Sequence, residues 1–555
     1  MFVRVKTTPN SPRKSVQIVQ SVRKADRVAQ KIIRYVGIAH DEQELEQLKD
    51  LAESIKIKLE ADSQYLLFGP EEIARMRTKG TRDETEDDYK VNLKNLKEEQ
   101  RVVRGIHDIY GSLFDDLGYK NVIKNPARND ASVKIFRDIV LARIANPKSK
   151  RASVDMLEED FGISMDLNRV YQMMDKLDEK AIDKLNDLAY ENTIKLFKGK
   201  IDVIFFDCTT LYFEAFEEDE FRKMGYSKDL KFNQPQVLFA LMVTKEGLPI
   251  GYRAFEGATY EGHTLIPILK ELKKKYTLDK VVFVADAGML NEPNIAELEK
   301  EDIEYVVGMR IKNLSRELQN QILDHSNYKV VKGIEDDEYK IGEFEYKGRR
   351  LIINHSAKRA RKDASDRQKA VDKLRKKLSK KKNPKEYMSN YGNRKYLKVE
   401  GTASIELNDE KIEQASRWDG LHGVVTNAEN LCEQEILKQY NHLWEVENAF
   451  RITKHDLKVR PVFHWKPRRV KAHIAIAFVS YTLVKHLEYR VKLQYRKMSP
   501  EKIRQCLVRA QTSIHFDVKK RIRYGLPSRL PRDARKIYDI CRINRKLTPF
   551  IIKKM

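Results

Sequence analysis

The stretch Val203–Glu214, VIFFDCTTLYFE, decides the fold and supplies the first candidate for chemistry. Its residues from Val203 to Phe206 are apolar and β-prone, and Asp207 follows them directly. Such a run is typical of a strand buried on both faces, and we expect the strand to end at Asp207. An ionised carboxylate is costly in this place unless a metal, a cation or a hydrogen bond compensates it. Asp207 is therefore a candidate functional residue.

A second apolar run, KVVFVAD at Lys280–Asp286, also ends on a carboxylate. Around the two runs, the strand period of two alternates with the helical period. This order predicts an α/β layer built on a mixed sheet. The other elements expected in this layer are strands at 236–245, 248–255 and 305–310 and helices at 264–276 and 293–301.

A predicted helix at Glu435–Leu457, EILKQYNHLWEVENAFRITKHDL, carries a third carboxylate. Tyr440, Glu447 and Lys454 are spaced by seven residues, which returns to nearly the same angle on an α-helix. Arg451 lies one turn beyond Glu447. One stripe of this helix is therefore expected to present a phenol, a carboxylate and cations.

Asp207, Asp286 and Glu447 together are the set that a two-metal phosphoryl-transfer site needs. Divalent cations such as Mg²⁺ take oxygen ligands, and a pair of them can activate the attacking oxygen and stabilise the leaving one. Three carboxylates would repel one another without such ions. Lys454 and Arg451, beside the glutamate, are expected to hold phosphates of the scissile strand.

Composition bounds the size of the protein and the chemistry of its partner. The chain has 555 residues, which corresponds to about three or four domains. Lys and Arg outnumber Asp and Glu by 107 to 83, a net charge of +24. This surplus favours a polyanionic partner, most simply nucleic acid, although a merely basic protein has the same balance. The four cysteines form no CxxC pair, which argues against structural zinc and a disulfide framework.

Neither the amino terminus nor the most apolar segment indicates a membrane. The amino terminus, MFVRVKTTPN, lacks a long apolar stretch, so we expect no signal peptide. The most apolar predicted helix, Ala472–Val484, is too short to span a bilayer. These features predict a soluble, cytoplasmic protein.

We expect the catalytic α/β layer to be one of several segments of the chain. The helical module before it could bind DNA ends or only pack and dimerise. The basic run KLRKKLSKKK in the insertion is either a solvated face or an arm that tracks phosphates. The expected segments are a small α+β region with a linker (1–100), the helical module (101–198), the two parts of the catalytic layer (199–310 and 418–490), a β-rich insertion with a basic helical segment (311–417) and a basic helical carboxyl-terminal region (491–555).

Taken together, these motifs resemble those of bacterial insertion-sequence transposases of the DDE type. FFDCTTLYFE resembles the first block of that family and VADAGML the second, and Tyr440, Glu447 and Lys454 match its Tyr-x2-Arg-x3-Glu-x6-Lys signature. There are two departures. Leu443 stands in place of the arginine, and Ala258 stands where an asparagine is expected in FEGATYEGHTLIP.

The likeness covers about residues 200–490 and includes RPVFHWKPRRVKAHIAIAF at 460–478. It implies a retroviral-integrase-like (RNase H-like) catalytic domain in which Asp207, Asp286 and Glu447 bind two Mg²⁺ ions, with Mn²⁺ able to substitute. The implied reaction cleaves the ends of an insertion element and joins the freed 3′-OH to target DNA. The implied partners are double-stranded DNA, as terminal inverted repeats and target, and a second copy of the chain in a synaptic homodimer at the bacterial nucleoid.

The resemblance also implies contacts with DNA. Tyr440 and Lys454 are expected near the cleaved end, and Arg451 could replace the phosphate contact of the arginine that is missing at Leu443. Trp418 has two interpretations, because it could stack on a displaced base or pack in the core.

Two other functions fit the same residues. A nuclease on this fold would cut DNA without joining it, and a catalytically silent, transposase-derived protein would only bind DNA. The intact Asp207, Asp286 and Glu447 argue against the silent protein. Only an assay of strand transfer separates the transposase from the nuclease, because both would use the same cutting site.

Overall fold

The computed structural model describes most of the chain in two compact units. The first unit holds residues within 1–108, 159–162 and 506–555, and the second holds residues within 109–158 and 163–505. Parts of the predicted linker and of the predicted basic helical segment, at 62–88 and 379–395, lie outside the described residues. The residues described are 2–7, 14–24, 27–39, 42–61, 89–197, 201–214, 217–225, 234–275, 282–288, 291–332, 338–378, 396–400, 404–460 and 462–552.

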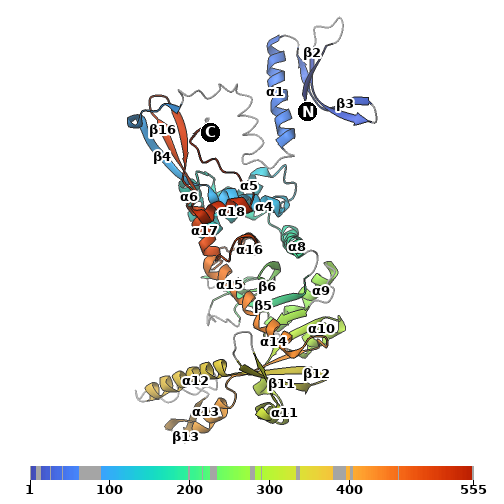
Figure 1. The fold of residues 1–555 in the computed structure, drawn as a ribbon, viewed down its shortest axis with the longest axis vertical. Coiled ribbons are helices and arrows are strands. Elements are labelled where there is room, and N and C mark those ends of the chain that lie inside the picture. The colour runs from blue at the N-terminus through green and yellow to red at the C-terminus, as the bar shows by residue number, and fades with distance from the viewer. Residues whose placement is uncertain are drawn as a thin grey trace. The chain divides into compact units, whose positions relative to one another are not determined.

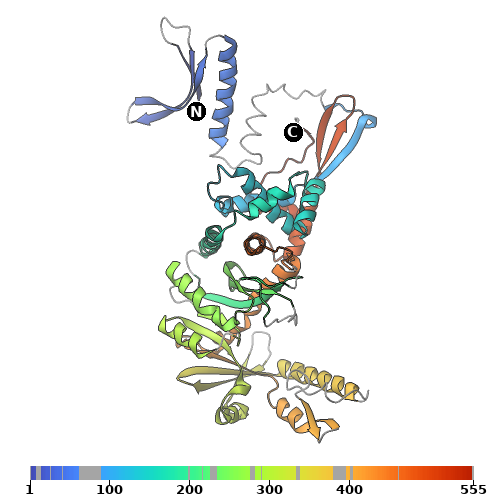
Figure 2. The same ribbon diagram turned by 180° about the vertical axis from the view of Figure 1, so that it is seen from behind.

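The chain begins with an antiparallel sheet and one helix. Strands β1 (Phe2–Thr7), β2 (Lys14–Lys24) and β3 (Arg27–Ala39) pair in this order. Helix α1 (Glu42–Ala61) lies beside them in both views (Figures 1 and 2). A small apolar core, including Val16, Ile18 and Leu45, joins the helix to the sheet. The secondary structure within residues 2–61 is therefore of the α+β type expected for the start of the chain.

A second sheet in this unit joins segments from far apart in the sequence. Strand β4 (Leu96–Val103) pairs with β16 (Gln511–Asp517) in the order β18-β17-β16-β4. The other two strands are β17 (Ile522–Pro527) and β18 (Phe550–Ile552), and the helices near them are α17 (Pro500–Val508) and α18 (Arg532–Ile540).

The prediction that the carboxyl-terminal region is helical is therefore wrong at β16, β17 and β18, which are strands. The sequence QTSIHFD of β16 contains two β-branched residues and buries Thr512 and Ile514 at alternate positions, as a half-exposed strand does. The basic composition of the region hid this short pattern, and the pairing partner β4 is too distant in the chain for sequence periodicity to reveal it.

The second unit begins and ends in helices. Helix α16 packs against α5, α7 and α8, so its long apolar run is covered by protein. Among the described residues, no helix is both long enough and apolar enough to cross a membrane. The helices of this part are α4 (Ser112–Asp116), α5 (Asp130–Ala145), α6 (Lys150–Phe161), α7 (Leu167–Met174), α8 (Glu179–Leu196) and α16 (Pro467–Gln494).

The centre of the second unit is a mixed sheet in the order β10-β11-β12-β15-β9-β8-β5-β6-β7. The pairs β5–β8 and β8–β9 are parallel and the others are antiparallel. The strands are β5 (Val203–Tyr212), β6 (Gln236–Thr244), β7 (Pro249–Glu256), β8 (Val282–Ala285), β9 (Glu304–Met309), β10 (Lys329–Lys332), β11 (Glu338–Tyr346), β12 (Arg349–Ser356) and β15 (Leu421–Thr426). The mixed α/β architecture predicted from the sequence is therefore present.

The sequence pattern predicted that the strand β5 ends at Asp207, and this prediction is wrong. The strand continues to Tyr212 because its antiparallel partner β6 stays paired with it as far as Gln236. Its parallel partner β8 stops earlier, at Ala285 opposite Phe206. Asp207 thus lies inside a strand, at the point where one of its two neighbours ends.

Helices cover both faces of this sheet. One face carries the main core, in which Phe206, Phe283 and Tyr305 are packed by α9 (Leu265–Lys275), α10 (Glu292–Lys300) and α11 (Arg316–Leu323). The opposite face is covered in part by α14 (Glu433–Asn441) and α15 (Trp444–Arg451).

Three strands of the predicted β-rich insertion, β10, β11 and β12, extend the central sheet, and β13 (Leu397–Glu400) and β14 (Ser404–Leu407) form a separate hairpin. The helix α12 (Ala357–Leu378) of the insertion lies beside this end of the central sheet (Figure 1). Val371 and Leu374 of α12 form a small core with Leu397 of the hairpin. Helix α13 (Asp409–Ser416) follows the hairpin.

The main core should contribute strongly to the free energy of unfolding of this unit, and Phe206 provides a test. Phe206 is fully buried against Phe283, with ring centroids 5.8 Å apart. We expect Phe206→Ala to lower the free energy of unfolding by about 3–5 kcal/mol through lost burial and a cavity. The control is Val330→Ala on the edge strand β10, where the side chain is 61% exposed and the change is expected within about 0.5 kcal/mol. Urea unfolding followed by tryptophan fluorescence measures both, and equal midpoints would contradict this assignment of the core.

Candidate active site

The register of three neighbouring strands places Asp207 and Asp286 side by side. Phe206, Ala285 and Val307 pair in one row across β5, β8 and β9, and all three belong to the main core. Successive residues of a strand point to opposite faces. The next residue along each segment, which is Asp207, Asp286 or Gly308, therefore faces away from that core. Neighbouring strands are about 4.8 Å apart, so the two aspartates begin from adjacent backbones.

Both aspartates are fixed locally in the same way. Asp207 Oδ1 accepts a hydrogen bond from the N–H of Cys208 at 2.7 Å, and Asp286 Oδ1 accepts one from the N–H of Ala287 at 2.5 Å. Asp207 is half-buried and Asp286 is exposed. Each carboxylate is thus held against its own backbone on the open face of the sheet.

The helix expected at 435–457 is not one continuous α-helix. Helices α14 and α15 are separated by a turn at His442 and Leu443, where the N–H of Leu443 donates to the carbonyl oxygen of Tyr440 at 2.9 Å. This three-residue hydrogen bond tightens the winding, and Leu443 is buried at the tightened turn. After Arg451 the chain widens into a π-helix at Ile452–Asp456. The prediction that Tyr440, Glu447 and Lys454 lie on one stripe of a regular α-helix is therefore wrong, because the segment is not one regular helix.

Helix α15 lies on the face that carries Asp207. Phe239 of β6 pairs with Thr209 and so shares this face with Asp207. Its ring meets that of Phe450 on α15, with centroids 6.0 Å apart. Glu447 stands nearly one turn before Phe450 on the same helix and is exposed. The third predicted carboxylate is therefore carried at the rim of this face.

Tyr440 of α14 reaches the same row through the space left by a glycine. A Cβ placed on Gly308 would lie 2.3 Å from the Tyr440 hydroxyl oxygen and 3.1 Å from the backbone nitrogen of Ala287. No side chain larger than hydrogen fits there without moving the tyrosine. The phenol hydroxyl consequently lies over β9, next to the loop that begins with Asp286.

The three candidate carboxylates all act electrostatically on the Tyr440 hydroxyl. Burial raises the pKa of Tyr440, and the negative charges of Asp286, Glu447 and Asp207 raise it further, while Arg359 lowers it. Of these three charges, that of Asp286 has the largest effect, as expected if it is the nearest, because Coulomb interactions weaken with distance. Tyr440 is therefore protonated at neutral pH and able to donate a hydrogen bond.

Two residues of this site escaped the sequence analysis. His422 of β15 faces the ring of Tyr440, with centroids 5.0 Å apart. Burial and the charge of Arg359 lower its pKa to about 4, against the opposing effects of Asp286 and Asp363, so it is neutral at neutral pH. Arg359 of α12 acts on both Tyr440 and His422. Arg359 was missed because it is one of several basic residues in the run KRARK, and His422 was missed because it belongs to no recognisable motif in its short strand.

The other predicted DNA contacts lie less centrally. The Arg451 guanidinium donates to Asn448 Oδ1 at 2.9 Å and lies 3.6 Å from Asp456 Oδ2. Lys454 is half-buried within the π-helical turn. Trp418 packs against the main core, with its ring centroid 6.0 Å from Lys312 Nζ.

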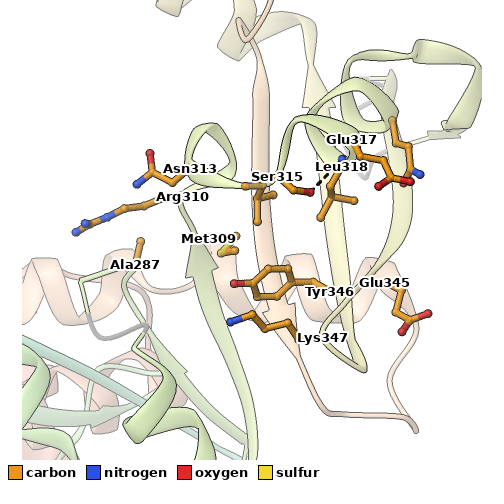
Figure 3. A pocket seen from close by; sticks show the side chains of 12 residues that line it. Ala287, Met309, Arg310, Asn313, Ser315, Glu317, Leu318, Glu345, Tyr346 and Lys347 are labelled. Carbon is orange, nitrogen blue, oxygen red and sulfur yellow. Dashed lines mark hydrogen bonds between the residues drawn. The ribbon is translucent and has the colours of Figure 1, made fainter.

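A groove of about 810 Å³ opens beside Ala287. Figure 3 shows Met309, Tyr346 and Lys347 together at its centre, with Arg310 and Ala287 at one side. Arg310 follows the last residue of β9 and is exposed. Ala287, which directly follows Asp286, therefore lines the groove, and Arg310 and Lys347 are basic residues in its lining.

The donor set fits divalent cations in chemistry but does not form a closed cage. Carboxylate oxygens are the ligands that Mg²⁺ prefers. Over the described residues, no group of three or more His, Cys, Asp and Glu side chains is arranged so that it could hold a metal ion. Mg²⁺ is usually held by one or two carboxylates together with water and substrate phosphate. An arrangement of separate carboxylates is compatible with that mode.

Comparisons with known proteins agree with the motifs. Residues 198–483 match the family model described as a transposase DDE domain, and residues 2–64 match that of the IS1634 family transposase N-terminal domain. One similar solved structure is the piggyBac transposase in a synaptic complex with hairpin DNA, at 12% identity and a TM-score of 0.36, with 73% of this chain and 76% of that chain covered. No curated protein matches the chain.

The close approach of Tyr440 to Gly308 is testable by a double-mutant cycle. We expect Gly308→Ala to destabilise the protein by about 1–3 kcal/mol, because the new methyl group would displace the phenol. In the Tyr440→Phe background the hydroxyl is gone, and the cost of Gly308→Ala should fall by at least about 0.5 kcal/mol. Chemical unfolding of the four proteins measures the difference. Additive effects would contradict the contact.

Proposed function

The chain belongs to the family of transposases with a DDE domain, and we propose that it cleaves the ends of its insertion element and joins the freed 3′-OH to target DNA. The observation that carries this proposal is the register of β5, β8 and β9, which places Asp207 and Asp286 next to each other on one face of the sheet. The mixed sheet, with both aspartates on one face of adjacent parallel strands, supports the expected RNase H-like class.

Asp207, Asp286 and Glu447 would hold two Mg²⁺ ions at this face. Bound there, such ions would activate the attacking oxygen and stabilise the leaving one. The chain itself supplies carboxylate oxygens on rigid strands and keeps them apart from the apolar core. In each aspartate, one carboxylate oxygen accepts a hydrogen bond from the N–H of the next residue. This bond orients the carboxylate and limits its rotation.

Tyr440 serves as a hydrogen-bond donor rather than as a nucleophile in this scheme. Burial and three nearby carboxylates disfavour its phenolate, so a covalent phosphotyrosine route is disfavoured as well. A protonated phenol over β9 is suited to donate to a phosphate oxygen of the cleaved end. The neutral His422 supports the ring from the side.

Cations around the carboxylates would hold the DNA strand. Lys454 and Arg451 are proposed to contact phosphates, as the family signature implies, and Arg359 is a further candidate because its charge reaches Tyr440. Trp418 stays a prediction, with its packing against the core favouring a structural role. Joining two element ends requires two sites, so we expect a homodimer on DNA.

The catalytic proposal is tested with the purified full chain, Mg²⁺ and a plasmid that carries the element with its flanks. We expect Asp207→Asn, Asp286→Asn and Glu447→Gln each to slow cleavage by roughly 1000-fold or more, because each removes an ion ligand. Binding to the same DNA should remain. Asp202→Asn, an exposed aspartate just before β5, is the control and should cleave normally.

The products of this assay also separate the alternatives. Cleaved and joined DNA indicates a transposase, whereas cleavage without joining indicates a nuclease. A wild-type chain that binds DNA but does not cut it would leave only the silent DNA-binding protein. Full cleavage by Asp286→Asn would overturn the assignment of that residue.

The two arginines near the helix are distinguished by comparing binding with catalysis. We expect Arg359→Gln to slow cleavage at saturating DNA by about 10-fold or more, since a charge-assisted contact near the reacting phosphate is lost. Arg451→Gln should instead weaken binding and reduce its salt dependence by about one counterion. A larger loss of cleavage rate in Arg451→Gln than in Arg359→Gln would reverse these roles.

A further inference from the structure

A buried cluster of basic side chains lies apart from the carboxylates. Arg143 is near the end of α5, Lys150 is the first residue of α6, and His473 is on α16. Their exposed fractions are only 4%, 5% and 6%. His464, before α16, completes the cluster, with its ring centroid 5.3 Å from that of His473. Basic side chains are rarely buried this deeply without an acidic partner.

Backbone carbonyl groups hold two members of the cluster in place. The Arg143 guanidinium donates to the carbonyl oxygens of Leu457 at 2.7 Å and Lys458 at 3.1 Å. His473 Nε2 lies 3.0 Å from the carbonyl oxygen of Val459. A carbonyl only accepts, so this nitrogen carries the proton. Arg143 and His473 are therefore fixed to residues 457–459, directly after the π-helical segment that carries Lys454.

Several polar groups of the cluster have no partner. Arg143 Nε and His473 Nδ1 are buried without a hydrogen bond. Among the described residues, the Lys150 ammonium makes neither a hydrogen bond nor an ion pair. Lysine and arginine side chains are donors only, so Arg143 Nε and the Lys150 ammonium offer donors with nothing to receive them. His473 Nδ1 is an acceptor in the neutral ring that donates through Nε2, and it becomes a further donor when the ring takes up a proton.

Among the residues that the structure describes, no carboxylate is among the charges that act on the cluster. Burial lowers the pKa of Lys150, and the one charge among the described residues that acts on it is the cation Arg143. Burial and the cations Lys150 and Arg143 also lower the pKa of His473. Burial, Lys150, Arg469 and Arg143 lower the pKa of His464 to about 3. An anion with several acceptor oxygens would remove this repulsion and use the spare donors.

The residues next to the cluster in sequence reach the solvent. Lys148 and Ser149 are exposed just before Lys150. Phe463 and Trp465, on either side of His464, are 60% and 63% exposed. The two segments that carry Lys150 and His464 therefore also present a basic turn and two aromatic rings to the solvent, and such residue types are common in surfaces that bind nucleic acids.

We propose that Arg143, Lys150, His464 and His473 form a binding site for one phosphate group. The phosphate is supplied by the DNA backbone or by free phosphate. The DNA source rests on the proposed function, because residues 457–459 directly follow the helix assigned to the element's end. The phosphate site itself does not depend on that function.

The phosphate site is tested on the full chain with inorganic phosphate as the probe, against chloride at equal ionic strength. Phosphate is expected to raise the unfolding temperature of the wild type by on the order of 2 °C. Lys150→Met keeps the length of the side chain and removes its charge, so this shift should vanish. Lys148→Met, in the same turn but exposed, is the matched control and should keep the shift.

Calorimetric titration of the wild type with phosphate measures binding directly and does not depend on whether a variant folds. Measurable binding supports the site, and its absence overturns the proposal. An equal phosphate shift in wild type and Lys150→Met also overturns it. Neither measurement uses DNA cleavage, so a failure of the proposed function would leave both results unchanged.

The source of the phosphate is decided by DNA binding at several salt concentrations. A decrease of about 0.9 in the slope of log affinity against log salt for Lys150→Met assigns the site to a DNA phosphate. An unchanged slope, together with loss of the phosphate shift, assigns it to free phosphate and excludes the DNA source.

Discussion

The candidate site depends on the register of β5, β8 and β9. With Phe206, Ala285 and Val307 in one row of the core, the following residues Asp207 and Asp286 are turned to the opposite face. A slip of one residue would exchange these faces. It would bury the carboxylates among apolar side chains and expose the aromatic ones, at a cost that neither the backbone pairing nor a helix could offset. The same packing that stabilises the sheet therefore positions the carboxylates.

The helical layer adapts to this row by departing from regular geometry. Gly308 leaves space for the Tyr440 hydroxyl, and the tightened turn before α15 changes the angle between Tyr440 and Glu447. The widened turn after α15 has the opposite effect on winding. Both irregularities lie within the segment that carries the family signature. The segment that carries Tyr440 and Glu447 therefore departs from the straight stripe that a regular helix would present.

Local pattern predicted part of this site and could not predict the rest. The apolar runs before Asp207 and Asp286 made both residues candidates, because burial and charge conflict within a few positions. The length of β5 depended on β6, and the strand character of β16 depended on β4, neither of which is near in sequence. Arg359 reaches the site only because the insertion extends the central sheet. Such pairings are set by packing at long range, which residue periodicity does not encode.

The most direct measurement is anomalous scattering from Mn²⁺ in crystals of the full chain bound to DNA that carries the element's end. The account predicts manganese peaks within about 2.1 Å of carboxylate oxygens of Asp207 and Asp286, with Glu447 on the same ions. Peaks located elsewhere, or an ion site that leaves Asp286 unligated, would contradict the claim that these three residues form one catalytic centre.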